Sequence, residues 1–331
     1  MSEIMIESRA LHRVYQSRTG DVEAVRGVDF VVEAGEIVGF LGPNGAGKTT
    51  TLQMLTTLLE PTGGEATVAG CDLRQDPVGV RQRIGYVSQS GSTDPEARAG
   101  EEIVDHARMY GITKVEALRS GRALFDQMDL GGLWDRKCKT LSGGQRRRLD
   151  VAMGLAHNPG LVFFDEPSTG LDPQSRANLW EHIRRLRDDL GTTVFLTTHY
   201  MDEADLLCDR ILVIDDGAIV SRGTPDELKR SIRGDSVSLT FPHPDNAVAV
   251  AEIASRLEGA TEPAIEGSEV RFNVPDGASV LPGLLRGMVD GDIELTGVEV
   301  HRPTLDDVFL TLTGRSLRED NVETEPAGQA A

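Results

Sequence analysis

The sequence has no hydrophobic run long enough to cross a membrane. Apolar stretches such as 37–41 and 161–164 end at turns or charges, well short of the roughly 18 residues that a membrane helix requires. The first ten residues do not show the pattern of a secretory signal, a basic segment followed by an apolar one. We therefore expect a cytosolic chain, unless a partner holds it elsewhere.

Cysteine and lysine are also scarce. The three cysteines at positions 71, 138 and 208 match neither a disulfide framework nor a zinc-binding spacing, so we expect reduced thiols. Only five of the 34 basic residues are lysine, and 53 acidic residues bring the net charge to −19. This charge argues against nucleic acid as a partner and against direct electrostatic binding to a membrane. A GC-rich coding bias and adaptation to a salty cytosol both remain open as its cause.

The length of 331 residues favours more than one domain. Residues 231–331 carry 18 acidic and 7 basic side chains, whereas 1–230 carry 35 and 27. This change in charge coincides with a turn and a capped short helix at 223–228. We predict a first domain over 1–232, a small C-terminal domain over 233–314, and a disordered acidic tail over 315–331.

The first domain alternates strand-like and helix-like segments, which favours an α/β fold with a largely parallel sheet. The expected segments are strands at 36–41, 161–165, 192–197 and 211–215, and helices at 48–59 and 173–190. The second domain shows the order βαββαβ, typical of a ferredoxin-like α+β sandwich, followed by a last helix. Its expected segments are strands at 236–241, 264–266, 269–274 and 293–301, and helices at 246–257, 280–289 and 304–312.

A phosphate-binding motif lies between the first strand and the helix that follows it. Its pattern, G-x-x-x-x-G-K-[ST], is formed by Gly42, Pro43, Asn44, Gly45, Ala46, Gly47, Lys48 and Thr49. Glycines let such a loop point its N–H groups at phosphate, and the helix N-terminus adds positive potential. Lys48 can then reach the β- and γ-phosphates, and the Thr49 hydroxyl can bind Mg²⁺. The sequence therefore predicts a P-loop that binds ATP with Mg²⁺.

Two acidic residues end the strand at 161–165. Asp165, at its carboxyl end, is placed to hold the water shell of the magnesium ion, and Glu166 to polarise an attacking water. Acidic residues often follow strands, so this assignment depends on the P-loop. Together the two motifs predict a nucleoside triphosphatase with Glu166 as its base.

Further motifs give the chain a family resemblance. The segment Leu141, Ser142, Gly143, Gly144 and Gln145 reads LSGGQ, the signature of the ATP-binding subunits of ABC transporters. Ser142 is a good helix N-cap, and the two glycines would expose N–H groups to a second anion. In chain order Gln89, the signature, the 168–172 segment and His199 also resemble motifs of this family. The resemblance implies a P-loop NTPase of the ABC nucleotide-binding type over residues 1–232.

The resemblance also implies a role for each motif. Tyr15 stacks on adenine, residues from Gly42 to Thr50 surround the phosphates, and Gln89 contacts magnesium and its water. His199 bonds the γ-phosphate. The signature closes over the nucleotide held by a second ATP-binding subunit, in a homodimer or a heterodimer, and Asp172 acts across that interface.

The segment 302–314 resembles the end of the daunorubicin-resistance type of ABC ATPase, a drug and lipid export branch. This implies an ATPase subunit on the cytoplasmic face of the cell membrane that dimerises on ATP and drives export through a separate transmembrane permease. Two alternatives stay open: the ATPase subunit of an importer, and a soluble ABC protein acting in translation or DNA repair.

Overall fold

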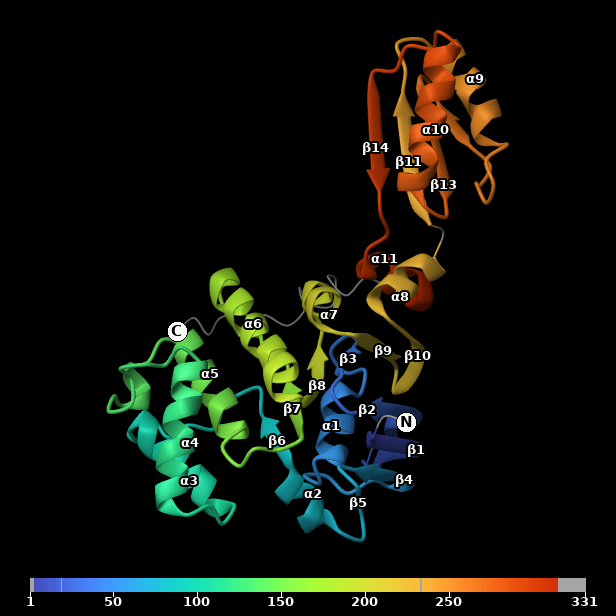
Figure 1. Cartoon of the computed structure of the whole chain (residues 1–331). Helices are drawn as coiled ribbons and strands as arrows, with labels where there is room; N and C mark the ends of the chain where they lie inside the picture. The colour runs from blue at the N-terminus through green and yellow to red at the C-terminus, as the bar shows by residue number, and fades with distance from the viewer. Residues whose placement is uncertain (1–2, 19, 233, 315–331) are drawn as a thin grey trace, which may run out of the picture. The chain divides into compact units, whose positions relative to one another are not determined.

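The structure is a computed structural model, and it describes residues 3–18, 20–232 and 234–314. The predicted tail over 315–331 lies outside the described residues. The chain forms two compact units, one reaching to Thr224 and the other beginning at Pro225 (Figure 1). The predicted division between 232 and 233 lies one short helix, α8 (Pro225–Ser231), further along the chain, and the domain assignment stays a prediction.

A six-stranded sheet in the order β10-β9-β3-β8-β7-β6 forms the centre of the first unit. Its strands are β3 (Ile37–Leu41), β6 (Ile84–Val87), β7 (Leu161–Asp165), β8 (Thr193–Thr198), β9 (Arg210–Asp215) and β10 (Ala218–Gly223). All neighbours pair in parallel except β10 with β9. Every residue of β3, β7 and β8 is buried, as expected of parallel strands covered on both faces. The predicted parallel sheet is confirmed.

A second, antiparallel sheet was not predicted. It has the order β2-β1-β4-β5, formed by β1 (Ile4–Tyr15), β2 (Val22–Glu33), β4 (Gly63–Val68) and β5 (Cys71–Asp72). Its apolar side chains share one core with the parallel sheet, and the Phe30 ring stacks on Phe195 of β8 at 5.8 Å. The long strands β1 and β2 carry many exposed polar residues, which hid their alternation in the sequence.

Helices complete the first unit. They are α1 (Lys48–Leu55), α2 (Pro77–Arg83), α3 (Ala99–Met109), α4 (Lys114–Gln127), the short 3-10 helix η1 (Cys138–Thr140), α5 (Gly143–Gly154), α6 (Pro173–Leu190) and α7 (Met201–Leu207). The helices α3, α4 and α5 pack on one another, and α5 also contacts β6 and α6 (Figure 1). Trp134 lies among them, so close to Gly100 that an added Cβ would come within 2.3 Å of the indole ring.

The parallel strands bring distant parts of the sequence to one edge. The P-loop follows β3, Gln89 lies just beyond β6, Asp165 ends β7, and His199 follows β8. Carboxyl ends of parallel strands meet at the same edge of a sheet, which is where such folds place their ligands. The sheet order therefore predicts the site that the side chains form.

The second unit is a βαββαβ sandwich with a last helix, as predicted. Its elements after α8 are β11 (Asp235–Thr240), α9 (Pro244–Ala254), β12 (Ala264–Glu266), β13 (Glu269–Val274), α10 (Gly277–Asp290), β14 (Gly297–His301) and α11 (Leu305–Thr313). The strands pair antiparallel in the order β12-β13-β11-β14. Alternate residues of β11 and β13 are buried against apolar residues of α9 and α10. At the other end of this unit, α8 lies against α11.

Two predicted boundaries are wrong by four residues each, and the end of the helix expected over 246–257 and the start of the helix expected over 280–289 are wrong by three. The helix expected over 48–59 ends at Leu55, because Thr57 adopts a left-handed conformation with φ of 62°. The strand expected over 293–301 begins only at Gly297. Ile293 and Leu295 pack instead against the core of the second unit, and the N–H of Ile293 bonds to the carbonyl of Met288 at the end of α10.

Candidate functional site

The P-loop runs from Gly42 to Thr49, between β3 and α1. Its shape requires glycine: Gly47, at the N-cap of α1, has φ of 99°, and an added Cβ would lie 2.4 Å from the carbonyl oxygen of Ala24. At Gly42 a Cβ would lie 2.2 Å from the carbonyl oxygen of Ile214. The first N–H groups of α1 have no acceptor within the helix, so they can bind an anion. The loop is a cradle that fits phosphate groups.

Lys48 is buried at the base of this loop. Its ammonium group donates to the carbonyl oxygens of Gly42 and Pro43 at 2.8 and 2.9 Å, and it lies 3.4 Å from Glu166 Oε1. Burial lowers the pKa of Lys48, and the carboxylates of Glu166 and Asp165 oppose that shift. The structure thus holds the positive charge of Lys48 beside the free N–H groups at the start of α1.

Asp165 and Thr49, both predicted to hold magnesium, lie in contact with each other. The Thr49 hydroxyl donates to Asp165 Oδ1 at 3.2 Å, and the Thr197 hydroxyl donates to the same oxygen at 2.7 Å. Burial raises the pKa of Asp165, against the two hydrogen bonds, and the neighbouring Glu166 charge raises it further. Because the buried Asp165 carboxylate is costly to ionise without a nearby cation, and a hydroxyl oxygen lies beside it, the pair fits a hard cation such as Mg²⁺.

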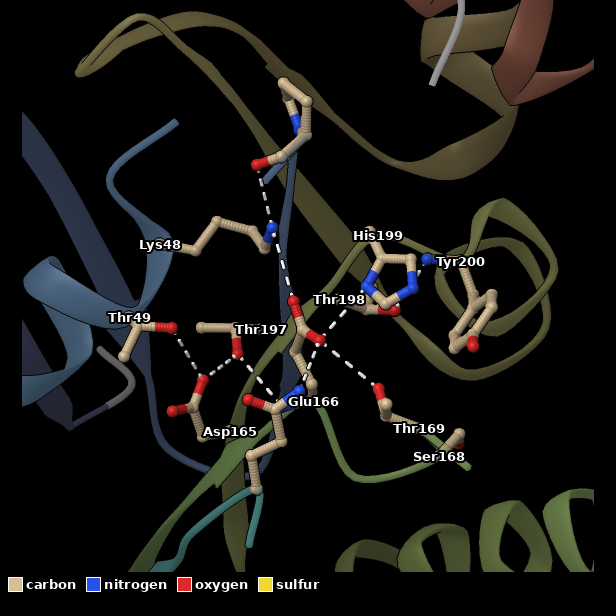
Figure 2. A network of polar contacts seen from close by, with 12 residues as sticks. Lys48, Thr49, Asp165, Glu166, Ser168, Thr169, Thr197, Thr198, His199 and Tyr200 are labelled. Atoms are coloured by element: carbon tan, nitrogen blue, oxygen red, sulfur yellow. Dashed lines mark hydrogen bonds and ion pairs between the residues drawn. The ribbon is translucent and has the colours of Figure 1, made fainter. Parts of the chain in front are cut away.

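Glu166 is the centre of the polar network (Figure 2). Its Oε2 lies 3.1 Å from Nδ1 of His199, accepts from the Gln89 amide at 3.1 Å and from the Thr169 hydroxyl at 3.2 Å, while Oε1 faces Lys48. The carboxylate therefore contacts four side chains that come from four different segments of the chain. Its backbone is held in the left-handed region, with φ of 43°.

The charge of Glu166 follows from these contacts. Burial raises the pKa of Glu166, but the hydrogen bond from His199 and the charges of His199 and Lys48 outweigh it, so that the net shift is downward. The carboxylate is consequently ionised at neutral pH. An ionised carboxylate held at the edge of an anion cradle can accept a proton from water.

Gln89 and Tyr15 differ in how the structure places them. Gln89 reaches Glu166 through its amide nitrogen, so its amide oxygen, the atom that could bind a cation, is not the one engaged there. Tyr15 ends β1 with 37% of its surface exposed, and the Arg13 guanidinium lies 4.8 Å from its ring centre. The adenine-stacking role of Tyr15 stays a prediction.

The signature residues form the start of α5. Ser142 is its N-cap, as predicted: its hydroxyl accepts from the Gln145 N–H at 3.2 Å, and the Gln145 side chain accepts from the Ser142 N–H at 3.0 Å. Gly143 has open space where a Cβ would be. Within residues 3–18, 20–232 and 234–314, no polar contact of the structure joins 141–145 to Lys48 or Glu166. One chain therefore brings the P-loop, Asp165, Glu166, Gln89 and His199 together and leaves the signature apart.

Asp172 also has a local function. It is the N-cap of α6, where its carboxylate accepts from the Ser175 N–H at 2.9 Å and from the Ser175 hydroxyl at 2.6 Å. The side chain is exposed, and the two bonds from Ser175 lower its pKa. Its predicted role across a dimer interface stays a prediction.

Thr197 and Arg147 of the site were missed by the sequence reasoning, and Thr169 was predicted only as part of the 168–172 segment, with no role of its own. Thr197 bonds both Asp165 and the N–H of Glu166, Thr169 bonds the Glu166 carboxylate, and Arg147 bonds the carbonyls of Asp165 and Pro167. Thr197 was detectable as a polar residue near the end of an otherwise apolar buried strand. Arg147 gave no such signal.

No helix within the described part of the chain is both long enough and apolar enough to span a bilayer. Two family models match the sequence. One, described as ABC transporter, matches residues 25–169, and the other, described as the C-terminal domain of DrrA1-3-like ATP-binding proteins, matches residues 223–313.

Curated proteins resemble the chain over nearly its whole length. It is 40% identical to the daunorubicin/doxorubicin resistance ATP-binding protein DrrA of Streptomyces peucetius, with 98% of this chain and 96% of that protein covered. It is 33% identical to the linearmycin resistance ATP-binding protein LnrL of Bacillus subtilis, with 95% and 100% covered. It is 39% identical to the Nod factor export ATP-binding protein I of Burkholderia lata, with 93% and 97% covered.

Solved structures give the same result for the fold. The dimeric structure of MJ0796, a bacterial ABC transporter cassette, aligns with a TM-score of 0.61 and 25% identity, covering 66% of this chain and 98% of that one. The ATP-binding subunit of an ABC transporter aligns with a TM-score of 0.61 and 27% identity, covering 69% and 92%. The predicted P-loop fold of the ABC type is confirmed.

Proposed function

Because the chain belongs to the ABC transporter family of ATP-binding proteins, we propose that it dimerises on ATP and uses hydrolysis to drive export through a separate membrane-spanning subunit. The observation that supports this most directly is the surroundings of Glu166. An ionised carboxylate lies 3.4 Å from the P-loop lysine and 3.1 Å from His199, which is the arrangement that water activation beside a phosphate requires.

The P-loop is the proposed site of the ATP phosphates. The N–H groups of residues 44–50 bind the phosphate oxygens, and Lys48 turns from the carbonyls of Gly42 and Pro43 toward the transferred group. Magnesium would be held by Thr49 and Asp165 with Gln89 beside them, and it would supply charge neutralisation at the phosphates. Tyr15 would stack on the adenine.

Glu166 is the proposed general base. Its carboxylate takes a proton from the attacking water, and His199 orients that water and bonds the γ-phosphate. The contacts with His199 and Lys48 hold the pKa of Glu166 below its usual value, so the carboxylate is ionised at neutral pH and can accept a proton. Thr169 and Gln89 hold the carboxylate in one orientation by bonding the same oxygen.

A second copy, or a related subunit, is proposed to complete the site. The signature of one chain is a capped helix start with open space at Gly143, and it is separate from the P-loop of the same chain. Facing the γ-phosphate of a partner, it would supply further N–H groups and the positive end of α5. Asp172 and Ser142 would then lie at the dimer interface.

The names of the relatives favour export of a hydrophobic compound. They include resistance proteins for daunorubicin, doxorubicin and linearmycin, and a Nod factor exporter. The match of the second unit to the C-terminal domain of DrrA-like proteins points in the same direction. We therefore propose a drug, a lipid or a similar compound as cargo, with the membrane contacted through the partner subunit.

Co-purification from detergent-solubilised membranes tests this function. A protein with several membrane spans should elute with the chain, and its presence should raise the rate of ATP hydrolysis. The chain with Lys48→Ala, which cannot hold the phosphates, serves as the control for the rate. Recovery of ribosomes or DNA in place of a membrane protein would contradict the proposal.

A further inference from the structure

Three consecutive arginines follow the signature on α5, and they face different environments. Arg146 is exposed, Arg148 keeps 18% of its side chain exposed, and Arg147 is buried with 7% exposed. Successive residues of a helix lie about 100° apart, so the three side chains point in different directions. Arg147 is the one of the three that is buried.

The guanidinium of Arg147 bonds to backbone carbonyls on two different segments. Nε donates to Pro167 at 2.8 Å and Nη2 donates to Asp165 at 3.3 Å, so both lie beside the base Glu166. Nη1 donates to Ser88 at 2.5 Å, the residue before Gln89. One side chain thus joins the segment after β6 to the segment after β7.

Asp150, one turn further along α5, holds the other end of the Gln89 segment. Its Oδ1 accepts from the N–H of Ser92 at 3.1 Å. Gly91 lies so close that an added Cβ would be 2.8 Å from Asp150 Oδ2. Gln89 is therefore flanked by two attachments to α5, at Ser88 and at Ser92.

Burial acts on both residues of this pair: it raises the pKa of Asp150, while the hydrogen bond from Ser92 and the charge of Arg147 oppose that rise. Burial lowers the pKa of Arg147, and the Asp150 carboxylate opposes the shift. A buried guanidinium that satisfies its donors on carbonyls in a fixed, planar pattern cannot be replaced by an ammonium without losing bonds. The attachment is accordingly specific for arginine.

We propose that Arg147, with Asp150, is a positioning residue that couples Gln89 and the Asp165–Glu166 segment to the signature at the start of the same helix. A displacement of either segment is transmitted to α5, because the three bonds of Arg147 are shared between them. The signature then moves with the state of the site in its own chain. The inference rests on the proposed function in one respect, the action of the signature on a second subunit.

Four variants of the full-length chain test the proposal: Arg147→Gln, Arg147→Lys, and the matched neighbours Arg146→Gln and Arg148→Gln. We expect Arg147→Gln to lower kcat for ATP hydrolysis by about tenfold or more, with KM and ATP affinity within about twofold of the unchanged chain. The kcat of Arg147→Lys should lie between that of Arg147→Gln and that of the unchanged chain, since its single ammonium group cannot reach three carbonyls. The two neighbours should change kcat by less than about twofold.

Equal kcat losses in Arg147→Gln and its neighbours would overturn the inference, and so would a loss confined to ATP affinity. If Arg147→Gln does not fold, Arg147→Lys takes its place, and the same two outcomes for that variant would overturn the inference. A double-mutant cycle adds a readout that a purely structural role would not move. Arg147→Lys should cost less in kcat when Gln89 is already alanine than when it is present, and equal costs in both backgrounds would refute the coupling.

Dimerisation separates this inference from the proposed function. In a Glu166→Gln background, MgATP should dimerise the chain and both neighbour variants, and should dimerise Arg147→Gln less. If none of them dimerises with its membrane partner present, the proposed function fails. If all dimerise equally, with Arg147→Gln included, only the inference fails.

Discussion

Replacing Glu166 with glutamine should separate nucleotide binding from hydrolysis. The substitution keeps the shape of the side chain, and the amide oxygen can still accept from Gln89 and Thr169 in place of Oε2. The amide nitrogen then faces Lys48, so the contact of 3.4 Å ceases to be an ion pair. What is lost is the proton acceptor and one negative charge.

The magnitudes follow from these two losses. Removing a general base lowers a rate by roughly 10² to 10⁴-fold, which corresponds to about 3 to 5 kcal/mol of activation free energy. Both side chains of the ion pair are buried, at 4% and 8% exposed, and breaking a buried pair costs about 3 to 5 kcal/mol when the remaining charge has no other partner. Lys48 keeps two carbonyl acceptors, so a smaller loss of stability is expected without nucleotide.

ATP should restore that stability, because its phosphates supply the negative charge that Lys48 has lost. We therefore expect a larger rise of the unfolding temperature with MgATP in Glu166→Gln than in the unchanged chain, a kcat lower by at least about a hundredfold, and an ATP-bound dimer in analytical ultracentrifugation. Glu181→Gln, on the exposed surface of α6, is the matched control and should behave as the unchanged chain. Normal turnover in Glu166→Gln would refute the assignment of the base.

Further predictions concern the cradle, the pH response and salt. Lys48→Ala should abolish ATP binding or hydrolysis, because it removes the only charge described within the P-loop of residues 42–49, and retained activity would remove that assignment. Gly47→Ala should be severely destabilising, since a Cβ would meet the Ala24 carbonyl at 2.4 Å with φ at 99°; thermal unfolding measures it. Burial lowers the pKa of His157 to about 4 from 6.5, so between these pH values the unfolded chain binds a proton and the folded chain does not. The free energy of unfolding should therefore fall as the pH is lowered from 6.5 to about 4, by up to about 3 kcal/mol for this group. His157→Gln should show a shallower fall in denaturant unfolding at pH 5 than the unchanged chain. If salt adaptation explains the net charge of −19, stability should rise with KCl into the molar range, and a flat response would leave coding bias as the cause.

Residues tied to local patterns were predictable from the sequence. The loop from Gly42 to Thr49 and the carboxylates of Asp165 and Glu166 sit at the ends of short apolar strands, and strand order then forces them together. The N-cap at Ser142 is likewise local, because its bond reaches only to the third residue of its own helix. Such features depend on a few residues that are close together in the sequence, so a local pattern is enough to predict them.

Long-range features were not predictable in the same way. The antiparallel sheet of β1 and β2 depends on a pairing with irregular register, which blurs the alternation of side chains. Arg147 bonds to backbone carbonyls, which every residue carries, so its partners cannot be inferred from residue types. Its side chain is identical to those of Arg146 and Arg148, so only the helix phase and the packing of α5 distinguish the three.

The separation of the signature from the P-loop within one chain has a genetic consequence. Under the proposed pairing, each polypeptide contributes half of two different catalytic centres. An allele damaged at the signature and another damaged at Lys48 could then complement each other, because their mixed pair contains one centre built entirely from intact halves. A single damaged allele, co-expressed with the normal one, would by the same reasoning leave one intact centre in every mixed pair, so the normal allele should mask it.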